Sequence, residues 1–293
     1  MAPIVCGVDR STPARAAARL SAAMAARVGV PLVLTHALPD GRADRREAES
    51  WLSRLSRELE LPDARLRVAV GPAARVLAAE DATLVAVGGA DGTWLGGRVR
   101  DALVRRAPAP VAVVPAVRRL GGAEVLCGVR DWADAGTADL AVRWARALGL
   151  QLALIHVLPK AHDPGGSAAP LLDRPADHDA AHRLLDAIAT AVSAADATWH
   201  VACGSARHVL AAEATAREAA LLVIGAPTHG RVGGALNASP STHLIHHTPR
   251  PLLVCPTSQR PSTDRALWPQ PAHHLPEWHE ALPIPARHPT MGT

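Results

Sequence analysis

The run Leu222-Val223-Ile224-Gly225-Ala226-Pro227-Thr228-His229-Gly230-Arg231 decides the fold of this chain, together with Ala238-Ser239-Pro240-Ser241 after it. An apolar strand leads into a loop of small residues, and the loop leads to a hydroxyl before a predicted helix. Such a layout brings backbone N–H groups close to a phosphate at a helix N-terminus. A weaker copy lies earlier, where the strand 84–88 continues into Gly89-Ala90-Asp91-Gly92. We therefore expect one loop of this kind in each half of the chain.

The two loops belong to a longer duplication. Six segments recur in the same order, among them Ile4-Val5-Cys6-Gly7-Val8-Asp9, which matches Val125-Leu126-Cys127-Gly128-Val129-Arg130. The sequence Val-Leu-Ala-Ala-Glu occurs at 76–80 and again at 209–213. Six matches in order make chance implausible, and each repeat is long enough to be a domain. We expect domains at 1–119 and 120–257, followed by a tail at 258–293 that is rich in Pro and His.

Each repeat is typical of alternating strands and helices. The strands are short, continuous apolar runs, as expected when both faces of a sheet are covered. The helices are amphipathic and are expected at 12–28 and 42–59 in the first repeat and at 135–148 and 177–195 in the second. An insert at 161–175, rich in Gly and Pro, is predicted to be a loop. Alternation of this kind predicts α/β domains with parallel sheets and right-handed crossovers.

Composition narrows the classes of function. Of the 293 residues, 48% are hydrophobic but only 2% are aromatic, all of them Trp, which argues against binding single-stranded nucleic acid by stacking. The net charge is +4, and the basic residues are spread along the sequence without a short run dense in Lys and Arg. Neither a nucleic-acid nor a membrane partner is therefore expected. No apolar run reaches the about 18–20 residues of a membrane span and no signal peptide precedes the first strand, so a cytoplasmic protein is expected. Cys6, Cys127, Cys203 and Cys255 lie in apolar runs and are predicted to be buried thiols.

With its loops and its duplication, the chain resembles the universal stress protein family in its tandem two-domain form, over roughly residues 3–256. The resemblance implies two flavodoxin-like, Rossmann-like open parallel sheets with strand order 3-2-1-4-5. Family members pair their domains through the fifth strands. Here Val111–Val114 and Leu252–Cys255 would pair and give an intramolecular pseudo-dimer, which would also cover two apolar edge strands.

The family signature for ATP binding is Gly, two residues, Gly, nine residues, Gly, then Ser or Thr. The second repeat keeps this spacing from Gly225 to Ser239, although Thr228 and Ala238 replace two of the glycines. The resemblance therefore implies a nucleotide site there. Its members would be Gly225, Thr228, His229, Gly230, Ser239 and Ser241, with Val129 and Val157 flanking the base. Arg130 replaces the Asp that the family has after the first strand, and it could instead meet phosphate.

The first repeat departs from the signature differently. Asp9 and Ser11 match the family's Val-Asp-x-Ser, and the loop is rich in glycine. The loop is shorter than the family spacing, and Arg98 follows Gly97 where the family has a hydroxyl. The expected nucleotide-binding residues in this repeat are Asp9, Ser11, Gly88, Gly89, Gly92 and Gly97.

Several other side chains invite a chemical role. His36 and His156 end equivalent strands, where each can either cap the strand through a ring hydrogen bond or meet a ligand. His178 and His182 have a metal-binding spacing without an evident third ligand. His243, His246 and His247 can reach phosphate or face solvent or a subunit. Asp9 and Asp91 are the one candidate pair of carboxylates for Mg²⁺. No general base is positioned by the sequence, so no enzyme is expected.

The sequence thus predicts a stress-response regulator with weak or vestigial ATP binding, with Mg²⁺ accompanying any ATP. Protein partners are expected, as is pairing within the chain, and a homodimer is a further assembly that the chain could form. One alternative is a scaffold that binds no nucleotide and acts through the pseudo-dimer and the tail. A slow ATPase is the other.

Overall fold

The fold is described by a computed structural model over residues 2–39, 44–89, 94–116, 121–159, 175–226 and 240–256. The first half of the chain contains β1 (Ile4–Gly7), α1 (Thr12–Val28), β2 (Leu32–Leu38), α2 (Arg45–Glu58), β3 (Arg65–Val70), α3 (Ala73–Ala78), β4 (Leu84–Gly88), α4 (Trp94–Arg106) and β5 (Val111–Val114).

The second half repeats this order with a short 3-10 turn before its first helix. Its elements are β6 (Glu124–Val129), the turn η1 (Trp132–Asp134), α5 (Ala135–Leu148), β7 (Gln151–Leu158), α6 (Pro175–Ala191), β8 (Thr198–Cys203), α7 (Ala206–Ala216), β9 (Leu221–Gly225), α8 (Pro240–His247) and β10 (Leu252–Cys255).

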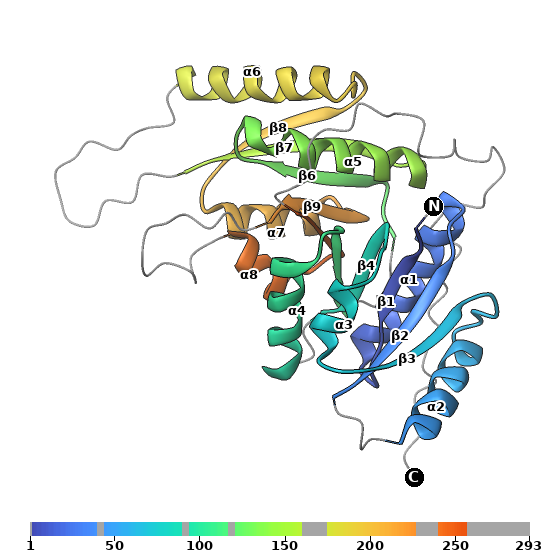
Figure 1. Ribbon diagram of the computed structural model, residues 1–293. Coiled ribbons are helices and arrows are strands. Elements are labelled where there is room, and N and C mark those ends of the chain that lie inside the picture. Colours follow the sequence, from blue (N-terminus) through green and yellow to red (C-terminus); the bar gives the residue numbers. More distant parts are fainter. Residues whose placement is uncertain are drawn as a thin grey trace, which may run out of the picture.

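All ten strands form one sheet in the order β3-β2-β1-β4-β5-β10-β9-β6-β7-β8. Each half is parallel and has the expected order 3-2-1-4-5. The halves join where β5 and β10 pair antiparallel, with Ala112 opposite Leu253. The predicted pairing through the fifth strands is therefore confirmed, and it turns two apolar edges into the middle of the sheet. The sheet twists strongly, so that the strands of the second half run across those of the first (Figure 1).

The helices cover the sheet on both faces, as right-handed crossovers require. One hydrophobic core gathers residues from α1, α2, α5 and α6, and the other gathers residues from α3, α4, α7 and α8. Both cores run through both halves. No described helix combines the length and apolar character needed to cross a bilayer.

Local signals in the sequence fix where the first helix starts and stops. The Ser11 hydroxyl accepts a hydrogen bond from the backbone N–H of Ala14 at 3.3 Å, and Pro13 stands in the first turn, where its missing N–H costs nothing. Gly29 ends the helix with φ of 67°, a left-handed conformation that glycine adopts without strain. This helix and α5 have the predicted bounds.

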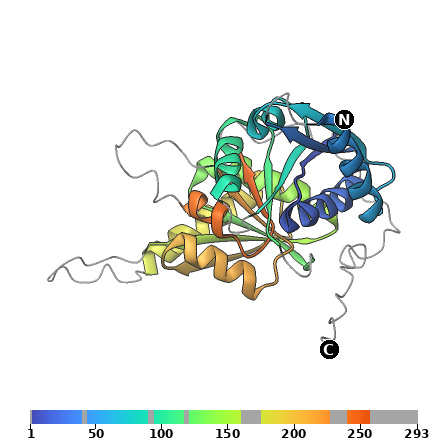
Figure 2. The same ribbon diagram turned by 90° about the horizontal axis from the view of Figure 1, so that it is seen from below.

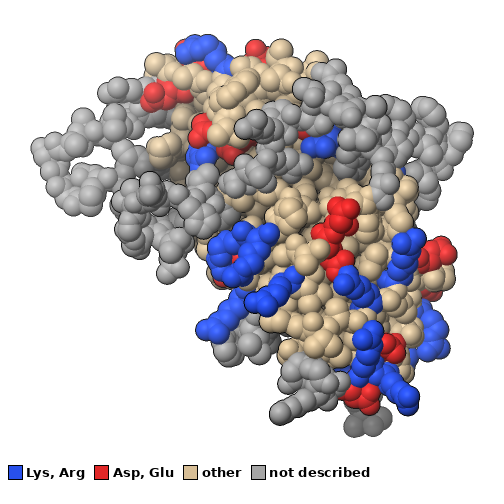
Figure 3. All heavy atoms as spheres, in the orientation of Figure 1, with Lys and Arg blue, Asp and Glu red and all other residues tan. Residues whose placement is uncertain are grey.

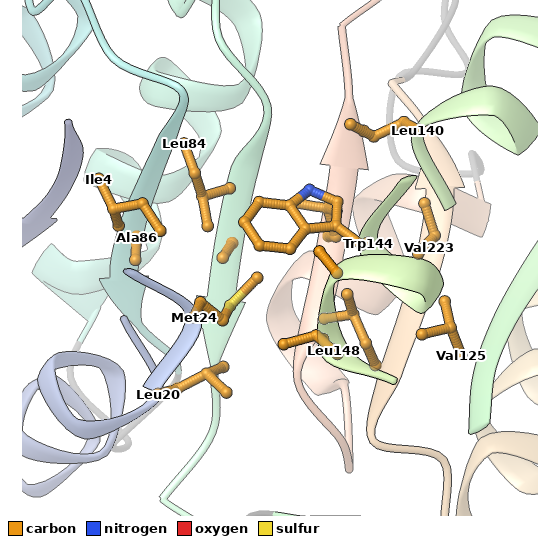
Figure 4. Close-up of a cluster of buried hydrophobic side chains, with 14 of the residues drawn as sticks. Ile4, Leu20, Met24, Leu84, Ala86, Val125, Leu140, Trp144, Leu148 and Val223 are labelled. Atoms are coloured by element: carbon orange, nitrogen blue, oxygen red, sulfur yellow. The ribbon is translucent and has the colours of Figure 1, made fainter. Parts of the chain in front are cut away.

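Helices α1 and α5 meet on one face of the sheet, and Trp144 of α5 fills the space between the halves. Its side chain is fully buried. Figure 4 shows the indole ring between Leu84 and Met24 of the first half and Val223 of the second. The core of the molecule is thus continuous across the junction.

On the opposite face, α4 and α8 lie side by side, as Figures 1 and 2 both show. His246 of α8 and Asp101 of α4 form a hydrogen bond with 2.9 Å between Nε2 and Oδ1. The nearest atom to an ideal Cβ on Gly97 would be Cε1 of His246, at 3.3 Å. His246 therefore faces α4 of the other half of the chain and not a phosphate site.

Three expectations need correction. The second helix of the first half begins at Arg45, because the Asp44 carboxylate accepts hydrogen bonds from the backbone N–H groups of Arg46 and Glu47. The corresponding helix of the second half spans Pro175–Ala191, earlier than predicted. Cys203 is only partly buried, because β8 is an edge strand.

The other three cysteines are buried free thiols, as predicted. Burial raises the pKa of Cys6 to about 12 and that of Cys255 to about 11, and it raises the pKa of Cys127 as well. These thiols stay protonated at neutral pH. The tail at 258–293 and most of the predicted insert lie outside the described residues.

Candidate functional site

The first cavity opens at the carboxyl end of β1. This strand lies between β2 and β4, which is where the strand order of the first half reverses direction. A crevice forms at such a switch point in open α/β sheets. The first cavity measures about 520 Å³. Its described walls include Val8, Asp9, Ser11, Ala37, Leu77, Gly88, Gly89 and Arg100.

Asp9 and Ser11 lie together just before the N-terminus of α1, and both line the first cavity. One carboxylate oxygen of Asp9, Oδ1, accepts hydrogen bonds from the backbone N–H of Ser11 at 2.9 Å and from its hydroxyl at 2.5 Å. The Ser11 hydroxyl in turn caps α1. These bonds fix the direction of the Asp9 carboxylate at the cavity rim.

Gly88 and Gly89 are required by the close approach of backbone segments. An ideal Cβ on Gly88 would lie 2.7 Å from the backbone nitrogen of Ala14, and one on Gly89 would lie 2.9 Å from Cα of Pro115. Any larger residue would push the start of α1 or the end of β5 away. The two glycines therefore hold the cavity walls together at the end of β4.

His36 caps the neighbouring strand, in agreement with the structural alternative. Its Nδ1 donates a hydrogen bond to the Val8 carbonyl at 2.8 Å, and since a carbonyl only accepts, Nδ1 carries the proton. The ring packs against Trp51 of α2, with 4.8 Å between centroids. His156 repeats the same bond to Val129 at 3.0 Å. Both histidines thus hold the first two strands of their half together, and His36 also lines the first cavity.

Arg100 of α4 lines the first cavity and is only 3% exposed. It is the single charged side chain among the fully buried residues of the described ranges. Sequence reasoning passed over this residue, although the repeat register could have found it. That register aligns Leu103 with Leu244 and therefore Arg100 with the predicted site residue Ser241. The matching strands of the duplication likewise place Val8 and Ala37 where Val129 and Val157 stand in the second half.

The second cavity lies at the equivalent place in the second half and measures about 150 Å³. Val129, Val157, Gly225 and Ser241 line it, so the structure brings these four predicted residues together. The Ser241 hydroxyl donates to the backbone carbonyl of Gly225 at 2.9 Å.

A carboxylate occupies the wall of the second cavity beside the first glycine of the signature. Oδ1 of Asp134 would lie 2.8 Å from an ideal Cβ on Gly225, and Oδ2 accepts from the backbone N–H of Arg130 at 2.8 Å. In the first half the backbone of Ala14 stands at this position beside Gly88. Asp134 therefore places a negative charge on the wall of the second cavity beside Gly225.

Arg130, which the sequence offered as a phosphate contact, lines the second cavity and is paired there with Asp131. Its Nε donates to Asp131 at 2.8 Å. This hydrogen bond lowers the pKa of Asp131 and raises that of Arg130. Both side chains are more than half exposed, so the pair is a surface interaction of small energy.

The structure does not unite all predicted residues. Gly97 faces His246 across the junction of the halves instead of lining the first cavity. Gly92, Thr228, His229, Gly230 and Ser239 lie outside the described residues, as does Asp91. Among the described residues, no group of three His, Cys, Asp or Glu side chains is arranged to hold a metal ion. His178 has Cys203 near it, with 3.7 Å between Nε2 and Sγ.

Histidines cluster between α7 and α8. The ring centroids of His243 and His208 are 5.6 Å apart and those of His243 and His247 are 4.7 Å apart. Burial lowers the pKa of His243, and the charges of His247, Arg207, His208 and His246 lower it further. The unfolded chain, in which the pKa is near 6.5, then binds this proton more readily than the folded protein does.

We therefore expect stability to fall as the pH drops below about 6.5, and part of that loss to disappear in His243→Gln. Urea midpoints at about pH 7.5 and pH 5.5 measure the effect. His182→Gln, which changes an exposed histidine on α6, is the matched control and should keep the wild-type difference. Equal differences in wild type and His243→Gln would contradict the expectation.

The model of the universal stress protein family matches residues 1–115 and again residues 125–256. No curated protein sequence matches significantly. A Pseudomonas aeruginosa protein described as functionally unknown is 19% identical with a TM-score of 0.63, over 87% of this chain and 92% of that chain.

A universal stress protein from Archaeoglobus fulgidus is 17% identical with a TM-score of 0.63, over 87% of this chain and 98% of that chain. A universal stress protein in complex with cAMP is 21% identical with a TM-score of 0.38, over 46% of this chain and 97% of that chain. The first two likenesses establish the fold over both halves.

Proposed function

Because this chain belongs to the universal stress protein family, with two family domains in tandem, we propose that it is a stress-response regulator that binds ATP weakly through its first cavity. We keep the division into domains at 1–119 and 120–257 and the tail at 258–293. The role is one of binding rather than catalysis, in the cytoplasm, with Mg²⁺ accompanying the nucleotide.

The size of the first cavity is the observation that carries this proposal. A volume of about 520 Å³ lies within the range of small-molecule sites, roughly 300–1,000 Å³, whereas the second cavity, about 150 Å³, falls below it. Val8 and Ala37 would flank the base, and Asp9 would accept hydrogen bonds from the ribose. Gly88 and Gly89 would contribute by holding the start of α1 and the end of β5 close to the end of β4, where both glycines line the cavity. Asp9 is also the one carboxylate among the described lining residues that could face Mg²⁺.

The second cavity is then the vestigial member of the pair. Asp134 repels phosphate at Gly225, and the Ser241 hydroxyl is already bonded to the Gly225 carbonyl. A nucleotide would have to displace both. We propose that this cavity stabilises the second half without taking up ATP.

The test compares two phenylalanine substitutions at equivalent positions. With ATP and Mg²⁺ at about ten times the Kd, the wild-type melting temperature is expected to rise by about 3 °C. Ala37→Phe fills the first cavity and should abolish the rise. Val157→Phe fills the second cavity and should keep it. A wild-type melting temperature that ATP leaves unchanged, or a rise lost only in Val157→Phe, would overturn the proposal.

Protein partners remain part of the proposed role. Pairing of the halves is internal, since β5 and β10 supply each other's edge. A scaffold acting through the tail depends on residues outside the described ranges, so we propose nucleotide binding first.

A further inference from the structure

The first cavity contains a buried positive charge, supplied by Arg100. A guanidinium stays protonated at neutral pH and has five N–H donors, so it can meet an anion as well as neighbouring protein groups. Arg100 lies in the second turn of α4, Arg98 lies before it, and the first turn has no acidic residue. The N-terminal part of this helix is therefore basic.

The second half shows what the equivalent position looks like without this charge. There Ser241 presents a neutral hydroxyl to its cavity, next to the carboxylate of Asp134. In the first half, Arg100 stands in place of Ser241, and backbone replaces the carboxylate. The charged residues that line the first cavity are Asp9, Arg10 and Arg100, which give a net charge of +1, and those that line the second are Arg130 and Asp134, which cancel. The wall of the first cavity is therefore more positive by one charge.

The surface around α4 has the same sign. Arg98, Arg105 and Arg106 are exposed along this helix, whereas its one acidic residue, Asp101, is paired with His246. Figure 3 shows basic side chains gathered over this part of the molecule. Such a field attracts anions towards the cavity mouth.

We propose that Arg100 is the anion-binding residue of the first cavity and that it selects ligands by a phosphate group rather than by the base. This inference rests on the proposed function, because it concerns the same cavity, but it assigns the discrimination to one side chain. A guanidinium donates paired hydrogen bonds that match the oxygens of a phosphate. The missing signature hydroxyl after Gly97 is then compensated from within α4.

Isothermal titration calorimetry of the full chain with ATP, AMP, adenosine and inorganic pyrophosphate tests the assignment. Arg100→Met keeps an unbranched side chain of similar size and removes the charge. Arg100→Lys keeps the charge and removes the paired N–H donors of the guanidinium. We expect Arg100→Met to weaken ATP at least about tenfold and to leave adenosine unchanged, with Arg100→Lys between the two. Arg105→Met, which removes an exposed charge at the other end of α4, is the control and should bind ATP within about twofold of wild type. Each variant's melting temperature without ligand reports any loss of folding.

The outcomes separate this inference from the proposed function. If ATP binds equally well to wild type and to folded Arg100→Met, the inference is wrong and the proposed function stands. If wild type binds pyrophosphate but not ATP, and Arg100→Met loses pyrophosphate, the inference stands and the proposed function is wrong. If neither ATP nor pyrophosphate binds to wild type, both are wrong.

Discussion

Replacing Trp144 by alanine is expected to lower the free energy of unfolding by about 3–5 kcal/mol, the largest effect of any substitution considered. The indole is fully buried and touches both halves, so its removal leaves a cavity that no single half can close by rearranging (Figure 4). Urea unfolding followed by circular dichroism measures the change.

Trp132→Ala is the matched control for Trp144→Ala. Trp132 lies in the same half and is 55% exposed, so its loss should cost no more than about 0.5 kcal/mol. If the two variants were equally stable, Trp144 would not hold the halves together, and the inference of a core that is continuous across their junction would be wrong.

Gly122→Ala is expected to cost about 2–5 kcal/mol, from backbone strain and steric overlap together. Gly122 leads into β6 with φ of 149°, and an ideal Cβ would lie only 2.0 Å from the Glu218 carbonyl oxygen. That oxygen cannot move freely, because Arg250 donates to it at 2.8 Å and also to the carbonyls of Gly121 and Ala219. The substitution therefore disturbs the place where the second half begins.

Gly29→Ala separates strain from overlap in this prediction. Gly29 also has a positive φ, of 67°, but an added Cβ there meets nothing within 4 Å. Its cost should be limited to about 1 kcal/mol of backbone strain. Urea unfolding of both variants gives the comparison, and a cost of Gly122→Ala no larger than that of Gly29→Ala would contradict the close approach to Glu218.

The fold followed from the sequence because its signals are local and occur twice. The amphipathic run at 12–28 predicted α1, which the structure bounds with Ser11 and Gly29, and short apolar runs between amphipathic helices predicted a parallel sheet. Pairing of β5 with β10 came from the family resemblance and from the need to cover apolar edges. The start of α2 was predicted too early. The residues just before Asp44 also suit a first helical turn, so the sequence alone does not show that the helix begins after the Asp44 cap.

The site could be predicted only in part. Asp9, Ser11, Val129 and Val157 could be predicted as cavity residues because strand ends and motif positions are readable from the sequence, and the structure places them on the walls of the two cavities. Arg100 was missed because motif spacing directs attention to the residue directly after Gly97, whereas burial at the next turn of α4 is a tertiary property. The carboxylate of Asp134 was missed for the same reason, since only packing of α5 against β9 brings it to Gly225.

The central claim is that one of the two cavities binds nucleotide and the other does not. Native mass spectrometry of the full chain with ATP and Mg²⁺ counts the bound nucleotides directly. The account predicts a single ATP per chain in wild type and none in Ala37→Phe. Two ATP molecules per chain, or one that persists in Ala37→Phe, would contradict it.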